Sequence, residues 1–156
     1  MKNLLFGILL FVSCVSVNAQ NINRNPAPKA QELITALKAE HRELKFIGLH
    51  VSPISGDTTN IIIASTITAK VGNKSSPGDM EVVNKGVMRL KTQIPAETYE
   101  VCLPIATSAK MPLGMVVIQI SFADAKSIVD ALQKGLNIRD DLQKKIKDKA
   151  ILFTTY

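Results

Sequence analysis

The hydrophobic and polar positions of the chain repeat with a helical period near both ends. Over residues 30–44 the apolar side chains recur every three or four residues, with Glu, Lys and Arg between them, which predicts an amphipathic helix. Over 128–136 and 138–146 the apolar residues are again four apart. Because Gly135 and Asn137 separate these two sets, we predict two C-terminal helical segments, the second capped by Asn137.

Five segments between these helices have the short apolar runs of β-strands. They cover residues 46–51, 61–66, 87–92, 98–105 and 113–122. Residues 79–86, after the second run, have the pattern of a short helix that Gly86 ends. The connections between the last three strands are too short for crossovers, which predicts antiparallel pairing. We therefore expect one α+β domain, in which a five-stranded antiparallel sheet is combined with a long N-terminal helix, a short helix after the second strand and a C-terminal helix.

Alternation along the strands sorts their residues into two faces of the sheet. One face is almost wholly apolar, is expected to pack against a long helix, and consists of Ile47, Leu49, Val51, Ile62, Ala64, Met88, Leu90, Tyr99, Val101, Leu103, Val116, Ile118 and Ile120. The other, here called the mixed face, consists of His50, Ile61, Ile63, Ser65, Arg89, Lys91, Glu100, Cys102, Met115, Val117, Gln119 and Ser121. Mixed polar and apolar groups under a short helix and a glycine-rich loop are typical of a small-molecule site.

Five polar side chains of the mixed face are the candidate ligand-binding residues. They are His50, Ser65, Arg89, Glu100 and Gln119. The forked donors of the Arg89 guanidinium suit a carboxylate, so we expect an acidic or zwitterionic metabolite. Arg89 and Glu100 on neighbouring strands also fit a cross-strand surface pair. The alternative is therefore a structural or protein-interaction domain of the cell envelope that binds no ligand.

Residues suited to catalysis or to metal binding are scarce. His41 and His50 are the only histidines, and no G-x-S-x-G is present. A pair of Cys102 with His50 is conceivable, but Cys102 lies in an apolar strand where nothing activates its thiol, so we predict no catalytic residues. The histidines lie on different elements without a paired ligand, which disfavours a metal site. One axial histidine suffices for haem, but a lone histidine is more often structural, so we expect no cofactor.

The N-terminal residues have the features of a cleavable signal peptide. Lys2 is followed by an apolar stretch over 4–12, and small residues stand at 17–19. We predict cleavage after Ala19 and a periplasmic or secreted location. Attachment as a lipoprotein through Cys14 is the alternative, although the residues before this cysteine are a poor lipobox.

Cleavage would leave a flexible leader over 20–29, with two prolines, and one domain over 30–156. No later segment is long and apolar enough to be a transmembrane anchor. The formal net charge of the whole chain is +6, but no basic run is interleaved with aromatic residues. We therefore expect a small-molecule ligand, with an envelope protein as a further partner, and no nucleic acid.

Four stretches, taken in order, carry a resemblance to a known family. They are Ile47-Gly48-Leu49-His50, then Ile63-Ala64-Ser65-Thr66 continuing to Val71-Gly72-Asn73-Lys74-Ser75, then Tyr99 to Ile105, and Pro112 to Val117. Over about residues 30–150 the chain resembles the extracytoplasmic PAS-like sensor domains known as Cache, or PDC, domains. Asp79-Met80 stands where that family begins its short helix. The chain departs from the family at a turn, where Ala109 stands at a position that is usually glycine. The resemblance implies a free-standing domain that binds a metabolite between sheet and short helix.

Overall fold

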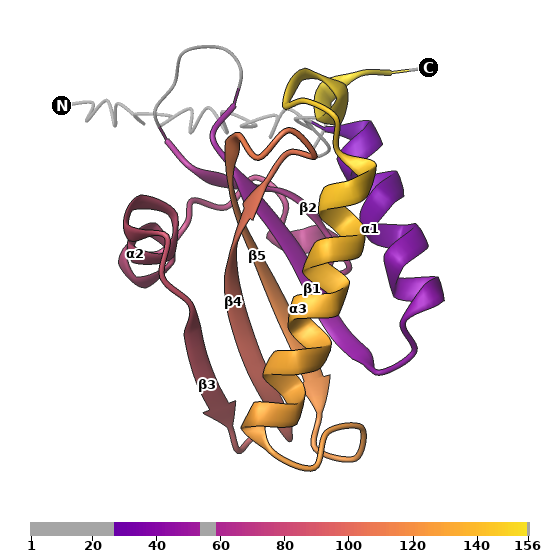
Figure 1. Cartoon of the computed structure of the whole chain (residues 1–156), viewed down its shortest axis with the longest axis vertical. Coiled ribbons are helices and arrows are strands. Elements are labelled where there is room, and N and C mark those ends of the chain that lie inside the picture. Colours follow the sequence, from indigo (N-terminus) through magenta and orange to yellow (C-terminus); the bar gives the residue numbers. More distant parts are fainter. Residues whose placement is uncertain (1–26, 54–58, 156) are drawn as a thin grey trace, which may run out of the picture.

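The computed structural model describes residues 27–53 and 59–155 (Figure 1). The predicted cleavage after Ala19 and the alternative, attachment as a lipoprotein through Cys14, concern residues outside these ranges. The elements are α1 (Pro28–Glu40), β1 (Leu44–Val51), β2 (Ile61–Ser65), η1 (Thr68–Lys70), α2 (Pro77–Lys85), β3 (Arg89–Gln93), β4 (Thr98–Ala106), β5 (Pro112–Ser121), α3 (Ile128–Lys145) and η2 (Ala150–Phe153), where η marks a 3-10 helix.

The five strands form one antiparallel sheet with the order β2-β1-β5-β4-β3. The predicted fold class, α+β with an N-terminal, a short middle and a C-terminal helix, is therefore confirmed. Helices α1 and α3 pack on one face of the sheet, and α2 lies against the other (Figure 1). The central strands are covered on both sides, while β2 and β3 are the edges.

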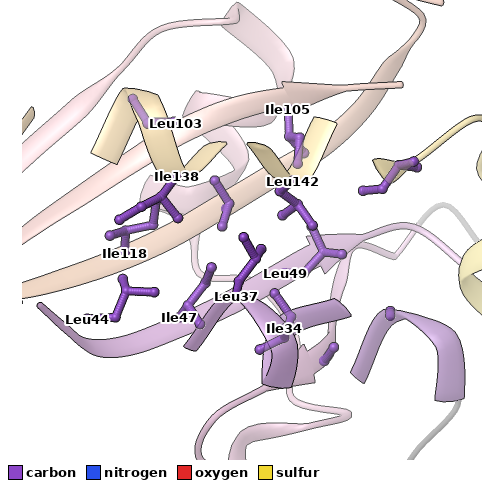
Figure 2. Close-up of a cluster of buried hydrophobic side chains, with 14 of the residues drawn as sticks. Ile34, Leu37, Leu44, Ile47, Leu49, Leu103, Ile105, Ile118, Ile138 and Leu142 are labelled. Atoms are coloured by element: carbon purple, nitrogen blue, oxygen red, sulfur yellow. The ribbon is translucent and has the colours of Figure 1, made fainter. Parts of the chain in front are cut away.

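The main core lies between the apolar sheet face and the helices α1 and α3 (Figure 2). Its large, fully buried side chains are Ile34, Leu37, Leu44, Ile47, Leu49, Ile63, Leu103, Ile118, Ile120, Ile138 and Leu142. Aliphatic residues thus fill the interior, as the few aromatic residues of the sequence require. Met88 and Leu90, expected on this face, are 53% and 38% exposed, since the edge strand β3 is only partly covered.

The N-terminal helix is displaced toward the N-terminus relative to its predicted bounds. It begins at Pro28, where the fixed φ of proline and its missing N–H suit the first helical turn. Ala27 in front of it is fully buried, so the last three residues of the expected leader belong to the fold. The helix ends at Glu40, and β1 already begins at Leu44, a residue that the sequence pattern assigned to the helix.

The prediction of two C-terminal helical segments is wrong, because α3 runs unbroken through Gly135 and Asn137. A Cβ atom at Gly135 would lie 3.0 Å from Val101 Cγ1. The glycine therefore allows α3 to pack closely on β4 and does not end the helix. Asn137 accepts a hydrogen bond from Gln133 one turn earlier, and the residue that caps α3 is Ser127.

The predicted face assignment of β2 is wrong for three residues. The register between β1 and β2 shifts next to His50, which pairs with Ile62. This irregularity places Ile62 on the mixed face, where it lines a cavity with His50. Ile61 and Ile63 pack into the main core instead. A bulge adds a residue to one strand, so strict alternation gives the wrong face beyond it.

Candidate functional site

Helix α2 is held on the mixed face by a small apolar cluster. Val82 is buried, and Val83 packs at its border. The sheet side of the cluster consists of Phe46, Cys102, Met115 and Val117. This contact fixes α2 over the middle of the sheet and leaves the polar residues of its first turn beside the mixed face.

The first turn of α2 is closed by reciprocal hydrogen bonds between Ser76 and Asp79. The Ser76 hydroxyl accepts from the Asp79 N–H at 3.2 Å, and Asp79 Oδ2 accepts from the Ser76 N–H at 3.0 Å. Pro77 stands at the start of the helix, and Gly86 ends it with a left-handed φ of 65°, as predicted for this glycine. The cap leaves the second carboxylate oxygen of Asp79 available to the sheet.

A cavity of about 240 Å³ lies between the mixed face and this end of α2. It is lined by Phe46, His50, Ile62, Lys70, Ser76, Asp79, Arg89, Glu100, Val117 and Gln119. Four of the five predicted ligand-binding residues therefore come together, one each from β1, β3, β4 and β5. Alternation along these four strands was sufficient to group them.

Ser65, the fifth predicted residue, is not among the residues that line this cavity. It is buried at the end of β2, and its hydroxyl accepts a hydrogen bond from the Ile67 N–H at 3.0 Å. The side-chain amide of Gln31 bonds the backbone N–H and carbonyl of Ser65, both at 3.0 Å. Ser65 therefore links the edge strand β2 to α1 through Gln31, a residue 34 positions away in the sequence.

Arg89 pairs with α2 and does not form the cross-strand pair with Glu100. Its Nη2 donates to Asp79 Oδ1 at 2.7 Å and lies 3.5 Å from Cys102 Sγ. The close approach requires Gly78, where a Cβ would lie only 2.0 Å from Arg89 Nη1. The side chain is 36% exposed, and its Nη1 and Nε make no hydrogen bond within 27–53 and 59–155. These donors remain available to a ligand.

Glu100 provides an acceptor in the cavity lining. Its Oε2 accepts hydrogen bonds from Gln119 Nε2 at 2.9 Å and from Gln93 Nε2. Both amides come from strands that flank β4. Side-chain amides orient the carboxylate without neutralising its charge, so Glu100 can attract a cationic group.

Lys70 adds a second cation to the rim of the cavity. The 3-10 turn η1 brings its Nζ to 4.7 Å from the centroid of the Phe46 ring, within the range of a cation–π interaction. Lys70 and Arg89 are thus balanced by the carboxylates of Asp79 and Glu100. The lining has both signs of charge, which suits a ligand that carries both.

His50 is buried at the cavity in its neutral form. Burial lowers its pKa to about 4, although Asp79, with Oδ2 4.0 Å from Nδ1, acts in the opposite direction. Burial would raise the pKa of Asp79, but its hydrogen bonds with Ser76, and then His50 and Arg89, hold that pKa below the usual value. At neutral pH the imidazole is therefore uncharged, and Asp79 is ionised.

Cys102 and His50 do not form a nucleophile and base pair. Strand β5 lies between their strands, and two strand spacings amount to about 10 Å. Burial raises the pKa of the Cys102 thiol to about 11, so the thiol is protonated at neutral pH. Within the described ranges no group of three His, Cys, Asp or Glu side chains could hold a metal ion. None of the described helices is long and apolar enough to cross a membrane.

Five residues of the lining were missed by the sequence analysis, among them Ile62, which was assigned to the apolar face. Ser76 and Asp79 could have been found, since a serine followed three positions later by an acidic residue is typical of a capped helix start. Phe46 could also have been found, because it has the same strand parity as His50. Lys70 carries no periodic signal, because the position of η1 depends on tertiary contacts of the loop.

A second cavity, of about 560 Å³, lies at the other end of α2 against the ends of β4 and β5. Its lining includes the apolar side chains of Val83, Ile105 and Leu113, together with the amides of Asn60 and Gln143. The five predicted ligand-binding residues do not line it. It therefore serves as the comparison site in tests of the first cavity, which lies at the N-terminal end of α2.

A comparison with protein-family models finds none that matches this chain, and a search of curated proteins finds no match. The class that the structure itself defines is a small α+β domain built on one five-stranded antiparallel sheet.

Proposed function

We propose that this chain is a binding domain, without catalytic activity, for a small acidic or zwitterionic metabolite. The observation that supports it is the convergence of His50, Arg89, Glu100 and Gln119, from four different strands, on one cavity under α2. Concave sites with a few convergent polar groups on an apolar floor are typical of small-molecule binding. The volume of about 240 Å³ has room for about eight water-sized groups, which suits a small metabolite.

The charges of the lining favour a zwitterion within this class. Lys70 and Arg89 offer donors to a carboxylate, and Arg89 keeps two nitrogens that make no bond within the described residues. Glu100 offers a negative charge to an ammonium group of the same ligand. A ligand with both groups could pair with the cations and with Glu100 without leaving a charge of its own unpaired.

The placement of the cavity supports a PAS-like or Cache-like sensor domain. The resemblance in sequence implies a ligand between the sheet and the short helix, and the cavity lies between the mixed face and α2. In this proposal, occupancy of the cavity changes how α2 is held, and an envelope protein detects the change. The domain then acts through that partner.

Export from the cytoplasm is part of the same proposal. It rests on Lys2, the apolar stretch over 4–12 and the small residues at 17–19. Intact-mass measurement of the protein recovered from the envelope or medium is expected to give Gln20 as the first residue. A lipidated Cys14 or an uncleaved cytosolic chain would contradict this expectation.

An interaction domain is the second candidate, because apolar side chains gather on and next to the edge strand β3. Val87, Met88, Leu90 and Ile94 are 46%, 53%, 38% and 69% exposed. An exposed strand edge with such side chains can pair with a strand from another protein. A partner bound in this way would protect the backbone amides of β3 from hydrogen exchange, whereas a metabolite in the cavity would not.

Replacement of Arg89 tests the proposed ligand site. Arg89→Ala is expected to weaken binding of the metabolite found in a thermal-shift screen by at least about tenfold, roughly 1.4 kcal/mol. The reason is the loss of the forked donors that face the ligand carboxylate. Calorimetric titration of the wild type and the variant gives the two dissociation constants.

Lys91→Ala is the matched control, because Lys91 is a cation on the same strand and the same parity but does not line the cavity. This variant is expected to bind as the wild type does. Comparable melting temperatures without ligand would show that both variants are folded. Unchanged affinity in a folded Arg89→Ala protein would contradict the proposed site.

A further inference from the structure

Three polar side chains form a hydrogen-bonded chain that leads from His50 in the cavity to Asn60, which lines the second cavity. His50 Nδ1 lies 2.9 Å from Ser75 Oγ, and Ser75 Oγ lies 2.6 Å from Asn60 Oδ1. His50 and Asn60 are each only 4% exposed. Water therefore has little access to His50 and Asn60, whereas Ser75 between them is half-buried.

The distances determine the direction of the hydrogen bonds. A separation of 2.6 Å is typical of O–H···O and short for N–H···O, so Asn60 presents its carbonyl oxygen and Ser75 donates to it. A hydroxyl has only one proton to donate, so Ser75 can only accept from the histidine. His50 therefore carries its ring proton on Nδ1, and its Nε2 has a free lone pair.

The Nε2 atom lies near Phe46, another residue of the cavity lining. A Cβ atom at Gly48 would be 3.7 Å from Nε2 and 3.0 Å from the end of the Phe46 ring, so the nitrogen lies near the aromatic floor. Nε2 has no hydrogen-bond partner within the described parts of the chain. Nε2 is not among the buried side-chain atoms that lack a partner in the described residues, so it stays accessible and a donor from a ligand can pair with it.

We infer that His50 is a specificity residue whose Nε2 accepts a hydrogen bond from the ligand, so that the site selects acids bearing an adjacent hydroxyl or ammonium group over the unsubstituted acid. This inference rests on the proposed function and narrows its ligand class. The neutral imidazole offers an acceptor and no positive charge at this position. A site built to pair with a ligand donor rejects the analogue that lacks it.

The state of His50 can be measured without any ligand. Long-range 1H–15N spectra of the full chain at neutral pH show which nitrogen of each imidazole is protonated. In a His41→Gln variant His50 is the one remaining histidine, so this variant identifies the His50 signals. We expect a protonated Nδ1 and an unprotonated Nε2. A protonated Nε2 would overturn the inference whatever the protein binds.

Ligand selectivity is measured with two series of acids that differ only in the adjacent group. Calorimetry compares propionate with lactate and alanine, and succinate with malate and aspartate. Within at least one series, the unsubstituted acid is expected to bind about tenfold or more weakly than a substituted one. Equal affinities within both series would overturn the inference and leave the proposed function standing. No binding by any of the six would contradict the proposed function itself.

Two variants separate a direct role of His50 from a structural one. His50→Phe removes the acceptor and keeps a ring in its place, so the preference for substituted acids is expected to disappear. Ser75→Ala removes the group that holds the proton on Nδ1, and it is expected to reduce the preference while His50 remains. A preference that persists in both folded variants would show that His50 does not contact the ligand. If His50→Phe does not fold, the Ser75→Ala result decides.

Discussion

Leu103→Ala is expected to lower the free energy of unfolding by about 2 to 5 kcal/mol. Leu103 is fully buried in β4, pairs with Val116 of β5, and lies in the main core (Figure 2). Its truncation removes apolar contacts and leaves a cavity that neighbouring strands and α3 can close only in part. Urea unfolding of the two proteins measures the difference.

Leu90→Ala is the matched control, since Leu90 has the same predicted face but is 38% exposed on the edge strand. Its replacement is expected to cost less than about 1 kcal/mol. A loss below about 1 kcal/mol at Leu103 as well would contradict the placement of the core on this face of the sheet.

Stability is expected to decline by as much as about 3 kcal/mol between pH 6.5 and pH 4 because of His50. Its pKa is lowered by burial to about 4, against an ordinary value of 6.5 in the unfolded chain. As the pH falls through this window, the unfolded chain binds a proton that the folded protein does not. The stabilisation is therefore complete above pH 6.5 and is progressively lost toward pH 4. Urea unfolding at a series of pH values measures it.

His50→Gln supplies the control, because glutamine does not titrate. In this variant the decline between pH 6.5 and pH 4 is expected to be smaller by the His50 contribution. The low pKa of Asp79 acts at more acidic pH, since its stabilisation is lost only as the pH falls below the usual range of an aspartate. An identical decline in the wild type and in His50→Gln would contradict the burial of a neutral imidazole.

The elements that the sequence predicted well are those with local causes. Alternation in β1, β4 and β5 reflects the pleat of each strand, and it was enough to bring His50, Glu100 and Gln119 to one cavity. Gly86 ended α2 as expected, because a left-handed residue after a helix is a local requirement. The fold class followed from the order of these elements.

The features that the sequence analysis missed depend on contacts between distant segments. The irregularity beside His50 changes the face of Ile62, and no local pattern marks it. Gly135 looked like a helix end, although its function is close packing of α3 on Val101. Ser65 had the parity of a ligand residue, but it bonds Gln31 of a helix far away in the sequence. Such contacts arise only when the elements are assembled.

The position of a bound metabolite tests the central claim most directly. Backbone 1H–15N spectra of the full chain, recorded while the metabolite from the thermal-shift screen is added, show which amides respond. We expect the largest shifts at His50, Arg89 and Gln119, which line the cavity under the first turn of α2. Shifts confined to Val83 and Leu113, in the second cavity, would contradict the proposed site.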